Sequence, residues 1–295
     1  RNKPLSNIPE IKFGSMPNDG GYLILSEEEY LMELKNDKQI QQFIKPMLGG
    51  QDFIKGIVRY CIWIEDDQIK EAQKIPFILK RINQVKSYRL ASKRDATKRL
   101  AAVPHRFGEV RHSNSELIII PATSSERREI IPMGFLNAGT VVNNSTQAIY
   151  NAKPWHLAMV LSKIHMIWVR AVSGRLESRI RYSSELSYNT FPFPTITEMQ
   201  KKELEKHVYK VLSEREAHTE KTLAQLYDPD KMPDGLRDAH YQLDIAVERC
   251  YRTKPFETDE ERLEYLFKLY EQMIEEEKSK GTLFETESKP KKKKK

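Results

Sequence analysis

The sequence predicts an α+β fold, in which a region of mixed strands and helices is followed by a small all-helical region. Apolar runs of strand length, such as residues 117–121, are concentrated before residue 195. After residue 196 the apolar residues recur at helical spacing, and Pro, Gly and Asp mark the joints between the helical stretches. Strands that precede a separate run of helices are typical of the α+β class.

Charge divides the chain at a similar place. Residues 1–183 contain 28 Lys and Arg against 18 Asp and Glu, whereas residues 184–288 contain 15 against 24. A basic region can face phosphates, and an acidic one repels them. Six further lysines stand in the last seven residues, so most of the formal charge of +7 belongs to that run. We predict a mixed sheet and helix domain over residues 1–195, a helical domain over 196–288 and a disordered lysine-rich tail over 289–295.

Composition disfavours several classes of protein. No apolar run reaches about 18 residues, so no membrane span is expected. Cys61 and Cys250 lie in no paired-thiol or zinc spacing, which indicates a reduced, cytoplasmic protein without a structural metal. The first residue is Arg rather than Met, and we expect the chain to be a fragment of a longer protein.

A buried helix followed by a charged strand is predicted in the middle of the chain. Dense apolar residues indicate a helix that begins at Pro154, is packed on most sides and stops at Gly174. Apolar and charged residues then alternate, the charged ones being Glu177, Arg179 and Arg181. In one extended strand these three side chains share a face. A solvated edge strand is the simplest explanation of such a face, because exposed charged faces are common.

A base-reading surface is the functional interpretation of the same face. The planar fork of Arg fits O6 and N7 of guanine, and a carboxylate can accept a hydrogen bond from N4 of cytosine. Glu177 and Arg179 together can therefore read one C·G pair in the major groove of DNA. Arg181 can reach a neighbouring base pair or a phosphate, and Arg175 is a further candidate for a phosphate contact.

The segment Lys80–Arg111 holds ten Lys and Arg against two acidic residues. Helical spacing brings several of its basic residues, beginning with Lys86, near one stripe that would follow a phosphate backbone. A helix that is merely solvated usually mixes both signs of charge. The phosphate contacts predicted from this segment are Arg89, Lys93, Arg94, Lys98 and Arg99.

Two more pairs of strands are predicted on either side of residue 138. Residues 116–136 form two strands joined by the polar connection 123–128, and residues 139–151 form another pair with Ser145 in its turn. The neighbouring Asn143 and Asn144 are potential adenine readers, but asparagine is also common in turns for backbone reasons. Phosphate contacts are predicted from the first connection, although a plain hairpin turn explains the same residues: Ser124, Ser125, Arg127 and Arg128.

The remaining elements are expected to be structural. Ser26 followed by Glu29 predicts a capped helix through Leu34, and residues 53–64 alternate enough to predict strands. Beyond Pro194 we predict an acidic bundle whose apolar stripes form a core and imply no cofactor. Its helices are expected at residues 197–214, 218–227, 236–251 and 259–278.

Several motifs together resemble one family. They are SSERREIIP, KIHMIWVRAVSGRLESRIRYS, YNTFPFP, YDPDKMPDGLRDAHYQLDIAVERCY and ERLEYLFKLYE, in this order along the chain. They resemble the target-recognition and C-terminal regions of the MmeI-like (Type IIL) restriction-modification enzymes and related adenine-specific DNA methyltransferases. The resemblance covers nearly the whole chain and includes FGSMPNDGGYLILS, which is similar to the family's passage out of the methyltransferase domain.

The resemblance implies that this chain selects a DNA sequence and that an upstream domain performs the chemistry. That upstream methyltransferase domain would bind S-adenosylmethionine and methylate N6 of a flipped adenine, so no cofactor is expected in this fragment. The chain has no NPPY-type catalytic motif, glycine-rich methyl-donor loop or nuclease carboxylate cluster. Its partners would be double-stranded DNA and the upstream domain. The family's base-reading positions fall on Glu177, Arg179 and Arg181, with another near Ser145.

Two other classes of function stay open. In the first, the acidic bundle docks a protein partner, and any DNA binding is weak, sequence-blind and lost with the lysine tail. In the second, the chain is an independent enzyme such as a nuclease, which would show metal-dependent activity on DNA. The chain lacks a carboxylate cluster beside a predicted strand end, which disfavours the second class.

Overall fold

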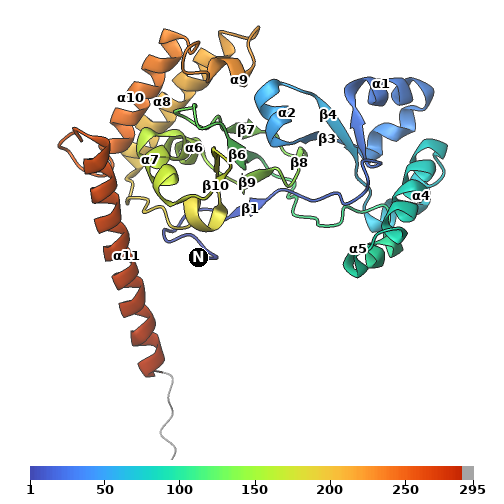
Figure 1. Cartoon of the computed structure of the whole chain (residues 1–295), viewed down its shortest axis with the longest axis horizontal. Helices are drawn as coiled ribbons and strands as arrows, with labels where there is room; N and C mark the ends of the chain where they lie inside the picture. Colours follow the sequence, from blue (N-terminus) through green and yellow to red (C-terminus); the bar gives the residue numbers. More distant parts are fainter. Residues whose placement is uncertain (288–295) are drawn as a thin grey trace, which may run out of the picture.

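Sheets lie in the N-terminal and central parts of the molecule, and helices gather towards its C-terminal end (Figure 1). The computed structural model describes residues 1–287, with side chains up to residue 279. The predicted α+β class is confirmed. The predicted lysine tail lies outside the described residues. Within residues 1–287, no helix has the length and apolar character needed to cross a membrane.

The N-terminal lobe, defined as residues 19–107, has its own sheet and hydrophobic core. Its strands pair in the order β2-β4-β3-β8, and the last strand comes from later in the chain and is parallel to β3. Buried residues from Leu23 to Phe107, together with Val141, form the core. The sheet consists of β2 (Ile24–Ser26), β3 (Ile44–Leu48), β4 (Arg59–Ile62) and β8 (Val141–Val142). The helices are α1 (Glu27–Asn36), η1 (Lys38–Phe43), α2 (Gly50–Lys55), η2 (Asp66–Gln68), α3 (Ile69–Ala72), α4 (Pro76–Leu90), α5 (Asp95–Arg99) and η3 (Leu100–Ala102).

A second, antiparallel sheet forms the centre of the molecule. Its strand order is β1-β9-β5-β7, and every residue of β5 and β9 is buried. Two apolar helices pack with this sheet in one core. The sheet consists of β1 (Ile11–Phe13), β5 (Leu117–Pro121), β7 (Gly134–Leu136) and β9 (Thr146–Tyr150), and the helices are α6 (Pro154–Leu161) and α7 (Lys163–Val172).

A third, small sheet stands beside α7. Its strand order is β10-β11-β6, all antiparallel. A single π-helical turn, η4 (Ser184–Tyr188), leads from it towards the C-terminal helices. The strands are β6 (Thr123–Ser124), β10 (Arg175–Leu176) and β11 (Arg179–Arg181).

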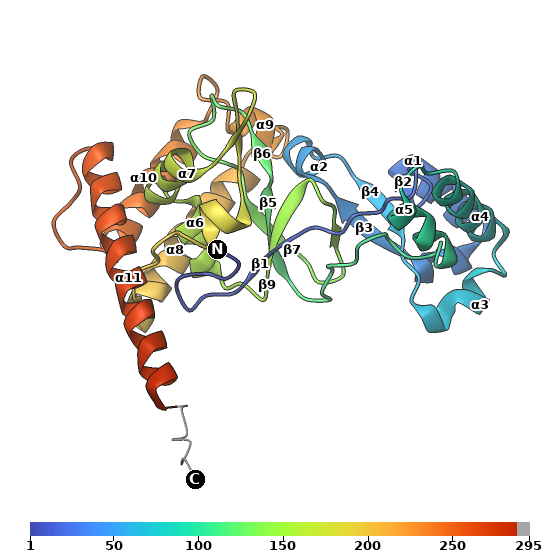
Figure 2. The same ribbon diagram turned by 60° about the horizontal axis from the view of Figure 1, so that its bottom comes forward.

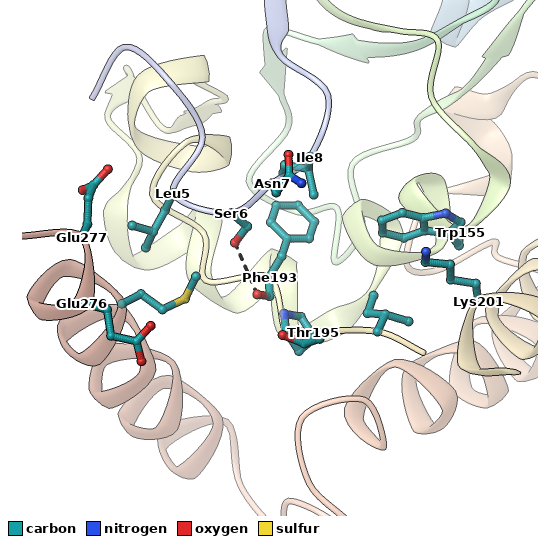
Figure 3. Close-up of a pocket in the computed structure, with 13 residues that line it drawn as sticks. Leu5, Ser6, Asn7, Ile8, Trp155, Phe193, Thr195, Lys201, Glu276 and Glu277 are labelled. Carbon is teal, nitrogen blue, oxygen red and sulfur yellow. Dashed lines mark hydrogen bonds between the residues drawn. The ribbon is translucent and has the colours of Figure 1, made fainter. Parts of the chain in front are cut away.

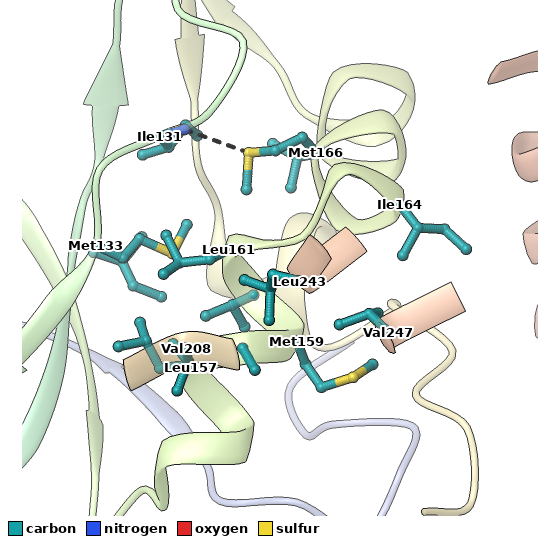
Figure 4. Packing of buried hydrophobic residues seen from close by; sticks show 14 of the residues in the cluster. Ile131, Met133, Leu157, Met159, Leu161, Ile164, Met166, Val208, Leu243 and Val247 are labelled. Carbon is teal, nitrogen blue, oxygen red and sulfur yellow. Dashed lines mark hydrogen bonds between the residues drawn. The ribbon is translucent and has the colours of Figure 1, made fainter. Parts of the chain in front are cut away.

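The C-terminal helices share the core of the central sheet. Figure 4 shows Val208, Leu243 and Val247 packed beside Leu157 and Met159 of α6, and all five belong to one buried cluster. Burial of each such side chain contributes about 1.5–3 kcal/mol. The division at residue 195 stays a prediction, and the hydrophobic core runs across it. The helices are α8 (Glu198–Glu216), α9 (Leu223–Leu226), α10 (Asp234–Glu248) and α11 (Asp259–Glu287), the last of which extends away from the body (Figures 1 and 2).

Two predicted elements differ from the structure for local reasons. The helix predicted from Pro154 to Gly174 is interrupted at Ser162, whose backbone is extended and whose hydroxyl accepts from the His165 N–H at the start of α7. The strand predicted from residue 53 is wrong at its beginning, because residues 50–55 form α2. The Asp52 carboxylate accepts from the Gly49 N–H at 2.8 Å and supports the first turn of this helix.

The strand pair predicted for residues 139–151 is also wrong, because its two strands do not pair with each other. β8 joins the sheet of the N-terminal lobe, whereas β9 lies in the central sheet. The turn at Asn143–Ser145 therefore links two sheets rather than closing a hairpin. The Ser26 cap is present as predicted, because its side chain accepts from the Glu29 N–H at 3.1 Å.

Candidate DNA interface

The charged segment after Gly174 is a two-stranded hairpin and not one extended strand. β10 and β11 pair antiparallel, with Leu176 opposite Arg179, and residues 177 and 178 form the turn. Glu177 has φ of +58°, which places it in the left-handed region. The prediction that Glu177, Arg179 and Arg181 share a strand face is therefore wrong for Glu177, which stands at the hairpin tip.

The hairpin tip nevertheless brings the predicted pair together. Arg179 Nη2 donates to Glu177 Oε2 at 2.9 Å, and both side chains are more than half exposed. Arg175 donates to the Ser178 carbonyl at 3.2 Å and braces the turn from the other strand. A carboxylate and a guanidinium thus stand side by side, exposed, at the end of a two-stranded ribbon.

Buried side chains anchor the hairpin to α7. Ile180 points inward between two exposed arginines, and Tyr182 directly after β11 is also buried. The Tyr182 hydroxyl and His165 Nε2 are joined by a 3.0 Å hydrogen bond in the core. Burial lowers the pKa of His165 to about 3, so the ring is neutral at neutral pH. The anchor therefore places no charge beneath the exposed arginines.

β6 extends the hairpin into a three-stranded sheet. Arg181 is paired with Thr123, and Ile180 is paired with Ser124. Directly opposite residues share a face, so Thr123 lies beside Arg181. Ser124 is buried, and its hydroxyl has no hydrogen-bond partner among the described residues. The predicted phosphate contact by the Ser124 side chain is wrong, because its strand position turns it inward.

Ser145 is connected to this sheet through the backbone. The Ala122 N–H donates to the Ser145 carbonyl and the Tyr182 N–H donates to the Ala122 carbonyl, both at 3.0 Å. The Ser145 hydroxyl donates to Asn143 Oδ1 at 2.6 Å and accepts from the Gly50 N–H at 2.8 Å. The residue is exposed and held in a fixed turn near the base of the hairpin.

Arg127 and Arg128 follow β6 and face the segment 224–230 of the C-terminal region. Arg127 is exposed and forms an ion pair with Asp230, which raises the pKa of Arg127. Arg128 is half-buried, and burial lowers its pKa. The two arginines and Ser125 line a small cavity of about 110 Å³ together with residues of the segment 224–229.

Arg89 is a structural residue. Its side chain is fully buried and donates hydrogen bonds to the carbonyls of five residues at 2.7–3.1 Å: Pro17, Asn18, Leu100, Val103 and Arg106. The predicted phosphate contact by Arg89 is wrong, because α4 turns this position towards the lobe's interior.

The other basic residues of the segment Lys80–Arg111 that are predicted to contact phosphates are exposed. α4 ends at Leu90, so the predicted stripe does not continue along one helix. The exposed side chains follow in the next turn and in α5, where Lys98 lies 3.9 Å from Asp95. In Figures 1 and 2, α4 and α5 lie in the N-terminal lobe, at the other end of the molecule from the C-terminal helices. These exposed residues are Lys93, Arg94, Lys98 and Arg99.

A cavity of about 530 Å³ lies where the N-terminal segment meets the C-terminal helices. Figure 3 shows Trp155 and Phe193 in its wall, with Lys201 and Glu276 nearby. The Ser6 hydroxyl donates to the Phe193 carbonyl at 3.3 Å across this junction. None of the predicted base-reading or phosphate-contacting residues lines this cavity. The described side chains also include no group of three or more His, Cys, Asp or Glu placed to hold a metal ion.

Sequence patterns did not predict a role in the site for three residues, Thr123, Tyr182 and His165. Thr123 reaches the hairpin only through long-range strand pairing, for which the sequence holds no local signal. Tyr182 alternates inward with Ile180, so its burial was predictable, but its bond to His165 was not. Pairings between distant residues depend on the fold and cannot be inferred from periodicity.

Comparisons with known proteins assign the chain to a family. A family model described as "MmeI, target recognition domain" matches residues 1–195, and one described as "MmeI, C-terminal domain" matches residues 196–276. The chain belongs to the MmeI family. The resemblance predicted from the sequence motifs is therefore confirmed.

Two relatives of this MmeI-family chain are informative. DNA methyltransferase A of Bacillus subtilis (strain 168) is 41% identical over 275 residues, which cover 93% of this chain and 31% of that protein. The solved structure of MmeI, a Type IIL restriction-modification enzyme in complex with DNA, is 35% identical with a TM-score of 0.88 and covers 93% of this chain. The MmeI-family chain spans about a third of the length of these relatives, since the match covers 37% of the MmeI structure.

Proposed function

We propose that this chain is the specificity part of an S-adenosylmethionine-dependent N6-adenine DNA methyltransferase that acts in restriction-modification or phage defence. The observation that carries the proposal is the exposed Glu177 and Arg179 pair at the tip of a hairpin. The relatives support it, because one is a DNA methyltransferase and the other is a restriction-modification enzyme in complex with DNA. In this proposal residues 1–195 recognise DNA and residues 196–288 form the helical domain.

The hairpin reads one C·G pair in the major groove. That groove admits a two-stranded β-ribbon, and β10 and β11 form such a ribbon. Arg179 donates to O6 and N7 of guanine, while Glu177 accepts from N4 of cytosine. The two side chains are 2.9 Å apart, so they can address the two bases of a single pair. A good bidentate contact contributes about 1–3 kcal/mol of discrimination.

Other polar and basic residues complete the interface. Arg181 and Ser145 read neighbouring base pairs. Arg181 lies on β11 of the hairpin, and Ser145 is linked through the backbone of Ala122 to Tyr182, directly after β11. Contacts with phosphates position the duplex and carry no sequence information. The proposed phosphate contacts are Lys93, Arg94, Lys98, Arg99, Ser125, Arg127, Arg128 and Arg175.

The chemistry belongs to an upstream domain of the same protein. That domain binds S-adenosylmethionine and methylates N6 of an adenine taken out of the stack, because an enzyme cannot reach the target atom inside a duplex. The chain described here contributes DNA binding and orientation and binds no cofactor. We place the complete enzyme in the cytoplasm, where its DNA substrate lies.

The decisive experiment exchanges the two charges in the complete enzyme. Methylated adenines are mapped by long-read sequencing for the natural enzyme and for Glu177→Lys with Arg179→Asp. We expect one position of the methylated motif to change from C to G while the rest is retained, because Lys donates to guanine and Asp accepts from cytosine.

A matched control exchanges the exposed ion pair on α11, with Glu264→Lys and Lys268→Glu. The control should leave the motif unchanged. If the hairpin variant loses activity with the same motif, the hairpin is structural and the proposed reading is wrong. If the natural chain binds DNA without sequence preference, the interaction-module function replaces it.

A further inference from the structure

The segment Ser125–Met133, here called the connecting segment, joins β6 to β7 without regular structure. Among the described residues, the connecting segment forms a single backbone–backbone hydrogen bond, from the Arg128 N–H to the Ser125 carbonyl. β6 immediately precedes the segment and supplies the strand on which the hairpin is paired. Contacts that hold the connecting segment therefore also influence the position of β11, because β11 pairs with β6.

Side chains hold the connecting segment from α7. Arg170 Nη2 donates to the carbonyls of Arg128 and Glu129 at 3.0 and 2.6 Å. The Ile131 N–H points to the sulfur of Met166, 3.5 Å away (Figure 4). These contacts occupy the middle of the segment and come from the recognition region itself.

Two parts of the C-terminal region hold the connecting segment near its ends. At its end, Arg215 of α8 donates to the Met133 carbonyl at 2.6 Å through Nη1. Near its beginning, Arg127 forms the ion pair with Asp230, which stands in the turn between α9 and α10. The C-terminal region thus contacts both ends of a segment that has little backbone support of its own.

Burial of the charged Arg215 side chain is unfavourable, so a packing role alone does not explain this residue. It is only 9% exposed, and its Nε donates to the Tyr227 hydroxyl at 2.7 Å, which in turn bonds His240 at 2.7 Å. Burying a charge is unfavourable in free energy unless the charge is hydrogen-bonded. An apolar residue can fill the same space without this desolvation penalty. The fork of Arg, however, can join the Met133 carbonyl, directly before β7, to the Tyr227 phenol at the end of α9 in fixed geometry.

We propose that the C-terminal helices position the base-reading hairpin, with Arg215 acting through Met133 and Asp230 acting through Arg127. In this proposal both are positioning residues, because each acts on the hairpin through another residue of the chain. This inference rests on the proposed function, and it reassigns Arg127 from a phosphate contact to a contact within the protein. The C-terminal region restrains the connecting segment, the connecting segment restrains β6, and β6 restrains β11.

The first test needs no DNA and uses the full chain. Amide hydrogen exchange is compared for the natural protein, Arg215→Met, Tyr227→Phe and Asp230→Asn, with Asp238→Asn as an exposed control on α10. We expect exchange at residues 123–133 and 179–182 to become at least threefold faster in the first three variants, while the central strands β5 and β9 are unchanged. Tyr227→Phe and Asp230→Asn keep the test decisive if Arg215→Met fails to fold.

Faster exchange throughout the molecule would make Arg215 a general stability residue and would overturn the proposal. Unchanged exchange in the connecting segment would overturn it as well. This measurement is independent of base reading, so it distinguishes a failure of the positioning contacts from a failure of the proposed function.

The second test measures discrimination in the complete enzyme. Methylation rates are compared on the natural site and on sites with one altered base pair. We expect Tyr227→Phe and Asp230→Asn to reduce discrimination at least threefold at the positions read by the hairpin and Ser145, with other positions retained. Equal loss at every position, or no loss, would overturn the positioning role.

Charge reversal separates the two roles of Arg127. If Arg127 is held by Asp230, then Arg127→Asp with Asp230→Arg should restore at least half of the discrimination lost in Arg127→Asp alone. If Arg127 contacts phosphate, the double variant stays impaired and binding loses salt dependence. That result would overturn the role of Asp230.

Discussion

At the scale of single residues, Arg89 shows how a basic side chain can serve the fold. Its five hydrogen bonds tie the loop at Pro17 and Asn18 to the end of the lobe's helical segment. We expect Arg89→Met to lower the free energy of unfolding by about 3–5 kcal/mol, because buried carbonyls lose their charged donor. Denaturant unfolding of the full chain measures this effect.

Lys86→Met on the exposed face of the same helix is the control, and its effect should stay within about 0.5 kcal/mol. If Arg89→Met is as mild as the control, Arg89 does not hold the two loops together. Burial also lowers the pKa of Arg89, in keeping with a guanidinium that has left water.

The burial of Arg89 was predictable in part. Ile78, Ile82 and Val85 precede it with the spacing of one helical face, and all three are buried. Arg89 continues this apolar stripe, whereas the charge count of the segment suggested an exposed position. The carbonyls that accept its hydrogen bonds come from loops as far away as Pro17, and no local pattern in the sequence reveals them.

At the scale of elements, the hairpin has an unusual turn. A two-residue loop with positive φ at its first position usually has Gly there. Glu177 occupies that position with φ of +58°. This explains why one strand was predicted, since the segment lacks the Gly or Asn that signals a turn. The proposed base-reading role of the Glu177 carboxylate gives a functional reason for a residue that is unfavourable locally.

The turn leads to a prediction about substitutions at residue 177. Glu177→Val should be less stable than Glu177→Gly by about 1–2 kcal/mol, because a β-branched residue tolerates the left-handed region poorly. Denaturant unfolding of the full chain provides the measurement. At Glu198, in the first turn of α8, the same two substitutions should show no such preference for Gly. Equal stability of the two variants at residue 177 would mean that the turn adopts another conformation.

Helices were predicted better than the connections between strands. Three of the four predicted C-terminal helices are present with shifted ends, because their apolar spacing and end signals are local. The helix predicted at residues 218–227 is reduced to the single turn of α9 at Leu223–Leu226. The break at Ser162 has no strong signal in the sequence, because a serine surrounded by apolar residues fits one continuous helix. It acts instead as the cap of α7, and its hydroxyl also donates to the Met159 carbonyl at 2.6 Å.

At the scale of the whole molecule, charge and packing divide the chain differently. The charge reverses near residue 184, but the core of α6 and α7 continues into α8 and α10. The sequence predicted the charge division because counting residues requires no knowledge of contacts. It could not reveal the shared core, which depends on packing between distant segments. The pairing of β1 with β9 is equally remote, since Ile11 lies opposite Ile149.

The exposed basic cluster of the N-terminal lobe leads to a prediction about binding. Each phosphate contact that is lost reduces the slope of log K against log salt by about 0.9. Replacing the four residues of the cluster by Gln should therefore reduce the slope by about 3.6 if all four contact DNA. The motif itself should not change, because phosphate contacts do not distinguish bases. The four residues are Lys93, Arg94, Lys98 and Arg99.

Binding of the complete enzyme to a duplex containing its motif, measured from 50 to 200 mM salt, tests this prediction. The control replaces four exposed lysines of the C-terminal helices by Gln, which removes the same charge from the acidic half: Lys202, Lys206, Lys210 and Lys268. If both variants lower the slope equally, the effect is one of net charge and the lobe does not contact the duplex. If only the lobe variant lowers it, the N-terminal lobe holds the phosphates while the hairpin reads bases, and affinity and specificity reside in separate parts of the molecule.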